Sequence, residues 1–202
     1  MNSNNRDYFK NFADMLYIFH DTLIIKLQEQ QPFVSDDEFL NIVFNNHECN
    51  FKLWNSEDCA RRDDMGYEFV YKAKRAIDTY NQHRNNFIEA MDAWLLQVLI
   101  PHADCSVNSE TPGMIIDRLS ILSLKIYHMQ LQTERLGAGD EHVNSCKNKL
   151  LILQVQKQQL SQCLQNLLLE IIEHQRTFKV YYQLKMYNDP NLNPQLYNNT
   201  AI

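Results

Sequence analysis

Glycine and proline are scarce in this sequence, which has only four glycines and five prolines among its 202 residues. Both residue types interrupt helices, so their scarcity leaves room for long helical segments. Four of the prolines fall where helices are expected to begin or end: Pro101, Pro112, Pro190 and Pro194. Sustained alternation of apolar and polar residues, which is typical of strands, is also lacking. We therefore predict an all-α fold, with a single domain over residues 1–202 built as a bundle of about five to six long helices.

Paired cysteines, long apolar runs and clusters of basic residues are lacking as well. The five cysteines are odd in number and form no C-x-x-C pair, so we expect free thiols in a reducing compartment. No segment approaches the ~18 uninterrupted apolar residues of a membrane span, and the N-terminal segment has no signal-peptide pattern. The net charge of −6 and the lack of a basic cluster argue against nucleic acid as a partner. We expect a cytoplasmic protein that folds without disulfides or zinc.

Apolar residues recur at three- and four-residue spacing along most of the chain, as on the packed faces of helices. This spacing predicts helices over residues 5–30, 36–62, 67–100, 112–136 and 141–173, with a continuation of the last one to residue 187 left open. Ser35 is predicted to cap the second helix, because Glu38 follows three residues later. Thr111 is predicted to cap the fourth helix, with Pro112 in its first turn. Residues 198–202 are expected to form a tail.

The predicted fourth helix combines charged and apolar residues in an unusual way. The segment "NSETPGMIIDRLSILSLKIYHM" places Asp117, Arg118 and Lys125 on a helix that is apolar on two sides. Such a helix should lie at the centre of the bundle together with the fifth. Charged groups that cannot reach water are costly unless they are paired, so we expect these three residues to form one buried polar cluster. The alternatives are a structural salt bridge for Asp117, and stems of Arg118 and Lys125 that carry their charges to water.

The predicted third helix carries a second polar stripe. Its members lie within about 80° of arc on the helix surface and are Asp78, Asn81, Asn85, Glu89 and Asp92. A solvated face is one interpretation. Asparagine is a poor helix former, however, so its repeated use favours hydrogen bonding to another helix or to a ligand. The i, i+3 carboxylates of Glu89 and Asp92 are suited to Mg²⁺.

Charged residues also follow Trp54, in the segment "NSEDCARR". Glu57 and Arg61 have the i, i+4 spacing of an exposed ion pair, and Asp58 lies between them. The sequence contains no catalytic triad, glycine-rich phosphate loop or H-E-x-x-H motif, and its histidines are too scattered to predict zinc ligands. The residues leave open whether the protein is an enzyme, and they predict no resident metal.

Several blocks of the sequence resemble successive blocks of one bacterial family: "LWNSEDCAR", "IDTYNQHRNNFIEAMD", "NSETPGMIIDRLSILSLKIYHM" and "VYYQLKMYNDPNLNPQLY". Together they span residues 50–197 and are similar to the family catalogued as domain of unknown function 4254, with the N-terminal helices in residues 1–50. The resemblance implies a helical, cytoplasmic protein of Gram-negative bacteria, often encoded beside lipopolysaccharide heptosyltransferase-type genes, and it implies no established reaction.

The family's polar pattern gives a set of candidate ligand-binding residues. By position it matches Glu57, Asp58, Arg61, Asp78, Asn81, Arg84, Asn85, Glu89, Asp92, Asn108, Glu110, Asp117, Arg118, Lys125, Lys185, Asn188 and Asp189. One departure is Asn86, where the family more often has aspartate. This departure weakens any role that requires a carboxylate at that position.

Two classes of function fit these residues. The first is binding of a sugar phosphate or sugar nucleotide in cell-surface polysaccharide or lipopolysaccharide biosynthesis, with Arg118, Lys125 and Lys185 on the phosphates. Arg84 would join them, and the asparagines of the third helix would bind sugar hydroxyls. A variant of this class is a Mg²⁺-dependent hydrolase similar to all-α nucleotide pyrophosphatases. The second class is a non-catalytic interaction or scaffold protein, acting with a glycosyltransferase or with a second copy of itself.

Overall fold

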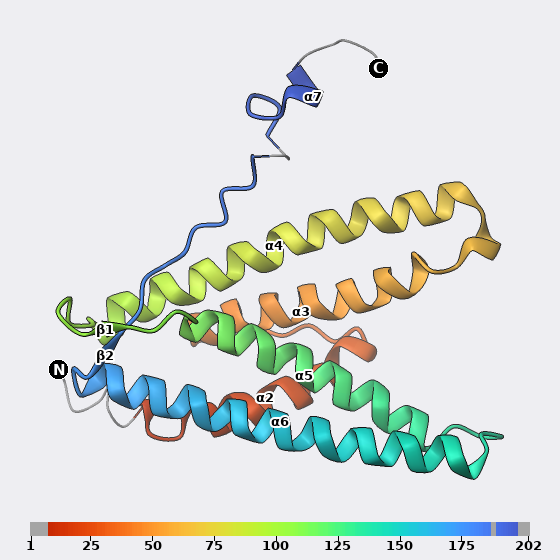
Figure 1. Cartoon of the computed structure of the whole chain (residues 1–202), viewed down its shortest axis with the longest axis horizontal. Coiled ribbons are helices and arrows are strands. Elements are labelled where there is room, and N and C mark those ends of the chain that lie inside the picture. The colour runs from red at the N-terminus through yellow and green to blue at the C-terminus, as the bar shows by residue number, and fades with distance from the viewer. Residues whose placement is uncertain (1–7, 187–188, 198–202) are drawn as a thin grey trace.

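In the computed structural model, which describes residues 8–186 and 189–197, five long helices account for most of the chain (Figure 1). They are α2 (Phe12–Gln28), α3 (Glu38–Cys59), α4 (Tyr67–Leu99), α5 (Pro112–Thr133) and α6 (Asp140–Ile172). The short elements are the 3₁₀ turn η1 (Asp63–Met65), the strands β1 (Ser106–Val107) and β2 (Arg176–Thr177), and the single-turn helix α7 (Pro194–Tyr197). The prediction of an all-α bundle is confirmed.

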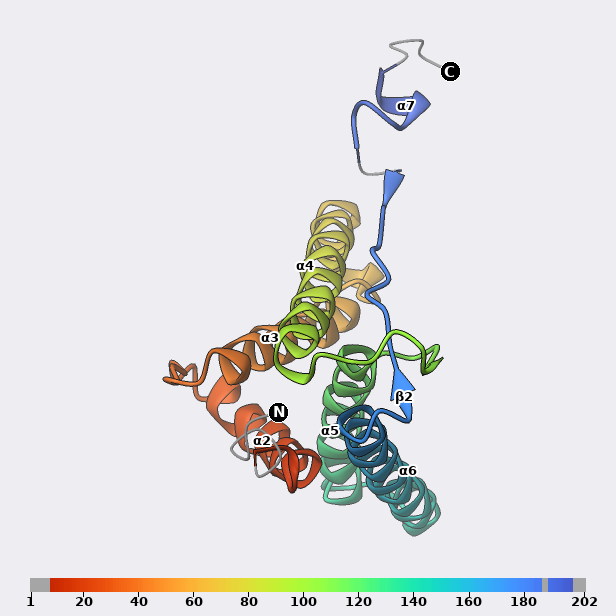
Figure 2. The same ribbon diagram turned by 90° about the vertical axis from the view of Figure 1, so that its left-hand side faces the viewer.

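The centre of the bundle is α5, which packs against α2, α3, α4 and α6. α3 and α4 form one antiparallel hairpin and α5 and α6 form another, and the two hairpins diverge toward their loops (Figure 1). The central position predicted for α5 is confirmed. The same position predicted for α6 is wrong, because α6 packs only on one side, against α5, α2 and β2. Its outer side exposes Leu151, Ile152 and Val155, and Figure 2 shows it at the edge of the molecule.

The helix caps agree with the sequence in one case and differ in another. Thr111 caps α5 as predicted, since its side chain accepts a hydrogen bond from the Met114 N–H at 3.2 Å, and Pro112 is the first helical residue. The prediction of Ser35 as the cap of α3 is wrong. Asp37 caps this helix, because its Oδ1 accepts hydrogen bonds from the first backbone N–H groups of α3. Ser35 Oγ instead accepts from the backbone N–H of Asp37.

Two separate clusters of buried apolar side chains stabilise the bundle. The larger cluster lies where α2, α5 and α6 meet the adjoining parts of α3 and α4, and it includes Phe39, Leu119 and Leu168. The smaller cluster lies between α3 and α4 near η1, and its buried members are Leu53, Ala60, Ala73 and Ile77. The α3–α4 hairpin is therefore packed into the main core at one end and stabilised separately at the other.

The chain after α6 does not continue as a helix, an extension that the sequence left open. α6 ends at Ile172, His174 adopts a positive φ of 57°, and β2 then pairs with β1 as a two-residue parallel ladder. Residues 178–185 are not helical; they run along α4, where the Gln183 N–H donates to Glu89 Oε1 at 2.8 Å. α7 lies away from the bundle in both views (Figures 1 and 2). This segment, residues 178–197, is called the C-terminal arm below.

Two further expectations concern the cysteines and the membrane. All five cysteines lie within the described residues and are unpaired, as predicted. Among the described helices, none combines the length and apolar character needed to cross a bilayer.

Candidate ligand-binding cleft

A buried carboxylate lies where α3, α4 and α5 come together. Asp117 of α5 is 5 % exposed, and its Oδ1 accepts hydrogen bonds from Asn46 Nδ2 at 3.0 Å and Asn50 Nδ2 at 2.9 Å. Arg84 of α4 faces the same oxygen, with its Nε 4.0 Å away. Two amides and a guanidinium thus compensate for the loss of water around this charge.

The hydrogen bonds continue from Asp117 into the core. Asn50 Nδ2 also donates to Ser120 Oγ at 2.9 Å, and a 2.8 Å hydrogen bond joins Ser120 Oγ to His47 Nδ1. The His47 ring stacks on that of His20, with centroids 5.1 Å apart. Burial, and then the charge of Lys157, lowers the pKa of His47 to about 3, and burial also lowers the pKa of His20. Both rings are therefore neutral at physiological pH.

A hollow of about 340 Å³ lies between the diverging hairpins. It is next to Asp117, because Asn50 and Arg84 both line the hollow and contact this carboxylate. We call it the cleft, and its lining residues are Asn50, Leu53, Trp54, Glu57, Asp58, Arg61, Asn81, Arg84, Ile121 and Leu124. Its apolar residues come from α3 and α5, whereas amide, carboxylate and guanidinium groups come from α3 and α4. A mainly apolar floor with a few convergent polar groups is the usual composition of a small-molecule site.

Arg84 is the cation best placed to act on a ligand in the cleft. Its side chain is 28 % exposed, and its buried Nε makes no hydrogen bond with any part of the chain that the structure describes. Arg84 Nε lies 4.0 Å from Asp117 Oδ1, which is too far for a hydrogen bond, so the attraction between the two residues is electrostatic. Arg61 is already paired, because its Nη1 lies 2.7 Å from Glu57 Oε2. Arg84 therefore retains donor capacity toward the cleft.

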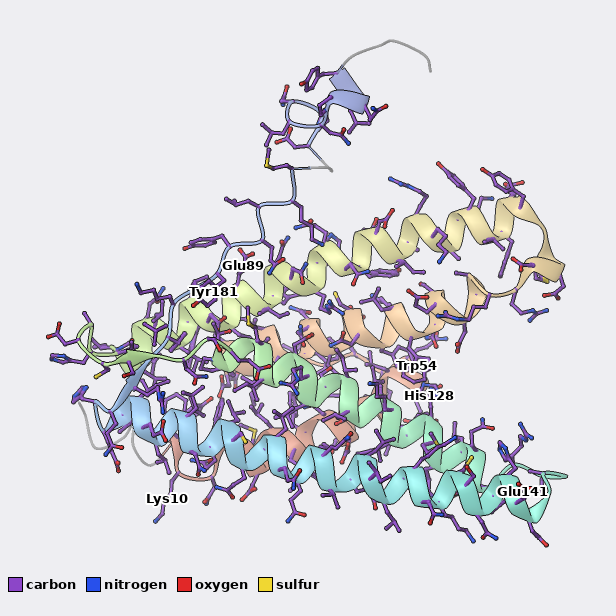
Figure 3. The ribbon with its side chains drawn as sticks, in the orientation of Figure 1. Lys10, Trp54, Glu89, His128, Glu141 and Tyr181 are labelled. Carbon is purple, nitrogen blue, oxygen red and sulfur yellow. The ribbon has the colours of Figure 1, made fainter. Side chains whose placement is uncertain are left out.

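An aromatic pair lies at the α3–α5 contact beside the cleft. The rings of Trp54 and His128 stack in parallel, with centroids 4.2 Å apart and an angle of 4° between the planes (Figure 3). His128 Nε2 is buried and has no hydrogen-bond partner among the described residues. Burial lowers the pKa of His128, and the charge of Asp58 opposes this shift. The imidazole is held neutral and rigid beside a carboxylate that lines the cleft.

The structure brings together six of the predicted site residues and places most of the others away from them. Five line the cleft and one lies beneath it: Glu57, Asp58, Arg61, Asn81 and Arg84, with Asp117 below. The prediction that Arg118 and Lys125 share a buried cluster with Asp117 is wrong, because both are exposed. At 100° per residue they point about 80–100° away from Asp117 around α5, toward α6.

Glu89 and Asp92, the predicted magnesium pair, have structural partners. Asp92 is 1 % exposed, and its Oδ1 accepts a 2.7 Å hydrogen bond from the backbone N–H of Gly113 at the start of α5. Glu89 accepts from Gln183 in the C-terminal arm. The described residues contain no group of three or more His, Cys, Asp or Glu side chains arranged to hold a metal ion.

The remaining predicted site residues lie outside the cleft. Asp78 is exposed and pairs with Arg75 at 3.2 Å, so the solvated interpretation holds for this member of the stripe. Asn85 is half-buried and does not line the cleft. Asn108 donates to the Glu110 carbonyl, and Glu110 Oε1 pairs with Arg118 at 2.5 Å. Lys185 and Asp189 belong to the C-terminal arm, and Asn188 lies outside the described residues.

A family model matches residues 40–180, more than two thirds of the chain. The chain belongs to the family described as protein of unknown function (DUF4254). The match to DUF4254 contains every residue that lines the cleft, and it ends at Val180, before most of the closing block of the resemblance. No curated protein and no solved structure matches the chain.

Several residues of the site within the DUF4254 match were missed by sequence reasoning. Asn46 and Asn50 donate hydrogen bonds to Asp117, and Ser120 links Asn50 to His47. Asn46 and Asn50 have i, i+4 spacing in a helix interior, which is the same signal that identified the asparagines of α4. This signal could have predicted that a polar face of α3 meets Asp117.

Proposed function

We propose that the cleft binds a small sugar ligand that carries an anionic group, such as a sugar phosphate or the sugar phosphate portion of a sugar nucleotide. The observation that carries this proposal is the guanidinium of Arg84, which lies beside Asp117 and lines a 340 Å³ hollow with a side chain that is 28 % exposed. A guanidinium presents paired N–H groups that match the oxygens of a phosphate.

The other cleft residues supply groups that a sugar requires. The Asn81 amide can donate to and accept from hydroxyl groups, and the Asp58 carboxylate accepts from them. Leu53, Ile121 and Leu124 offer an apolar surface to a face of the ring. The family resemblance to proteins encoded beside heptosyltransferase-type genes supports a carbohydrate of cell-surface or lipopolysaccharide biosynthesis. A Mg²⁺-dependent hydrolase has less support, since Glu89 and Asp92 have other partners.

Isothermal titration calorimetry tests the proposal by measuring the affinity of wild type and of Arg84 variants for fructose 6-phosphate, UDP-glucose and inorganic phosphate. Arg84→Gln should weaken the binding of a phosphorylated sugar about tenfold or more, because it removes a charge-assisted contact. Arg84→Lys retains a charge beside Asp117 and so preserves the fold, but it loses the bidentate geometry and should also weaken binding. Arg75→Gln is the matched control, because Arg75 lies on the same helix in an exposed ion pair with Asp78. Binding that Arg84→Gln leaves unchanged would contradict the proposal.

A second function, as a self-associating interaction protein, is favoured by the C-terminal arm. The arm carries exposed apolar side chains, including Tyr182 at 70 % and Leu184 at 84 % exposure. The Gln183 N–H of the arm donates a hydrogen bond to Glu89 of α4, and α7 beyond it stands clear of the bundle (Figure 1). Apolar side chains on an extended arm are typical of contacts between copies of a chain.

A further inference from the structure

A second hollow lies on the other side of α5, between α5 and α6. Its volume is about 530 Å³, and its lining residues are Arg118, Ile121, Leu122, Lys125, Gln156, Gln159, Leu160 and Cys163. We call it the α5–α6 groove. Its floor is apolar, as in the cleft, but its polar groups are cations and amides. No carboxylate is among the residues that line it.

The two cations of the groove lie on one side of α5. Arg118 and Lys125 are seven residues apart, which places them about 10 Å apart along the helix axis on nearly the same face. Lys125 is exposed and makes no salt bridge within the described residues. Arg118 is 56 % exposed, and only its Nη1 is engaged by Glu110. Lys125 is therefore the cation of the groove whose charge is left to accept an anion, because the charge of Arg118 is shared with Glu110.

The cleft and the groove meet at Ile121, which lines both. At 100° per residue, Leu124 and Asp117 lie about 40–60° to one side of Ile121 around α5, whereas Lys125 and Arg118 lie about 40–60° to the other side. One side chain of α5 thus separates a hollow that faces Arg84 from a hollow that faces Lys125. A ligand that passes over Ile121 would contact both.

We infer that the cleft and the α5–α6 groove are two lobes of one elongated site, which takes a sugar carrying two separated anionic groups. This inference rests on the proposed function and adds a second anion position to it. One anionic group binds Arg84 in the cleft, and the second binds Lys125 in the groove. Asp117, next to Arg84, and Lys125 are eight residues apart, so the two positions are separated by about 12 Å along the axis of α5. The chemical class is therefore a sugar bisphosphate, or a sugar nucleotide with a further acidic group.

Titration with two matched probes tests this inference at constant ionic strength. Fructose 6-phosphate carries one anionic group, and fructose 1,6-bisphosphate carries a second one at the far end of the same sugar. Wild type should bind the bisphosphate about tenfold more tightly, the usual effect of one added charge-assisted contact. Lys125→Gln should abolish this preference, so that both probes bind with similar affinity. Lys149→Gln is the control, because Lys149 is an exposed lysine of α6 outside the groove.

The possible outcomes distinguish this inference from the proposed function. If fructose 6-phosphate binds through Arg84 but the bisphosphate binds no more tightly, or keeps its preference in Lys125→Gln, the two-lobe site is wrong and the proposed function stands. If the bisphosphate binds through Lys125 without any effect of Arg84→Gln, the groove binds anions alone, and both the two-lobe site and the proposed role of the cleft are wrong. If wild type binds neither probe, both fail together.

Discussion

At the scale of single residues, Asp92 joins α4 to the beginning of α5. The backbone N–H of Gly113 donates to Asp92 Oδ1 at 2.7 Å. A Cβ on residue 113 would lie 2.7 Å from both this oxygen and the Ile88 carbonyl, so only glycine permits this approach. Burial raises the pKa of Asp92 to about 6, against the opposing effect of hydrogen bonds from Thr111 and Gly113. The carboxyl group therefore titrates in a range where most exposed aspartates are already ionised.

This raised pKa predicts a pH-dependent stability. Between about pH 4 and pH 6 the folded protein binds more protons at Asp92 than the unfolded chain does, so the stabilising effect of the neutral form is lost as the pH rises. Asp92→Asn removes the titration and keeps an acceptor for Gly113. Its free energy of unfolding, relative to wild type, should rise by about 2–3 kcal/mol from pH 4 to pH 7.

Denaturant unfolding of both proteins at intervals of one pH unit measures this difference. Asp78→Asn is the control, because Asp78 lies on the same helix and is exposed. The difference in free energy of unfolding between Asp78→Asn and wild type should change little from pH 4 to pH 7. If plots of the free energy of unfolding against pH stay parallel for Asp92→Asn and wild type from pH 4 to pH 7, Asp92 ionises normally in the folded protein.

The candidate site was predictable from the sequence only in part. Asp117 could be expected inside the bundle, because it lies on a helix that is apolar on two sides. The exposure of Arg118 and Lys125 could not be predicted in the same way, because the long aliphatic part of each side chain allows its charge to reach water from the edge of a packed face. Asn81 was a candidate through the polar stripe of its helix and Arg84 through the family resemblance, and the sequence could not say that Arg84 would face Asp117. That contact joins residues of two helices and depends on how those helices pack.

At the scale of elements, local signals predicted most of the helices and failed where distant segments meet. α4 was predicted over residues 67–100 and spans Tyr67–Leu99. The continuation of α6, which the sequence left open, does not occur because the chain turns at His174 and pairs β2 with β1, which lies about seventy residues earlier. Such pairing leaves no periodic signal in the segment itself. The same reason explains why the C-terminal arm was not predicted.

The C-terminal arm predicts self-association through its apolar side chains. Replacing Tyr182 and Leu184 together with serine removes two exposed apolar groups from the arm, so it should shift an oligomer toward monomer at a given concentration. Sedimentation velocity over a range of concentrations measures this shift. The folded bundle should not lose stability, since neither side chain is part of the core.

A matched control uses another exposed apolar surface, on the outer side of α6. Leu151→Ser with Val155→Ser alters the outer side of α6, where both residues are more than half exposed. If these changes dissociate the oligomer and those in the arm do not, the contact lies on α6. A wild type that stays monomeric at every concentration would contradict self-association altogether.

At the scale of the whole molecule, the cleft lies between two hairpins with unequal support. The α5–α6 hairpin packs against α2 along the main core, whereas the α3–α4 hairpin reaches beyond that core to its own small cluster. Leu53 and Ile77 belong to this small cluster, and Trp54 and Asn81 line the cleft next to them. The wall of the cleft is thus formed by the part of the fold with the smaller apolar core.

The separation of the two apolar clusters has a consequence for local unfolding of the molecule. Residues 55–80 around the η1 turn should undergo subglobal opening at a lower free energy than α5, because only a small apolar cluster must be disrupted. Native-state amide hydrogen exchange should show weaker protection of the amides in residues 55–80, the tip of the α3–α4 hairpin, than of the amides in α5. Equal protection in the two regions would contradict separate opening of this hairpin tip. A sugar phosphate held between Arg84 and α5 would selectively slow amide hydrogen exchange in the hairpin tip, residues 55–80. Recognition in this protein would then be linked to a local folding equilibrium, and the affinity for ligand would depend on the fraction of molecules in which the hairpin tip is closed.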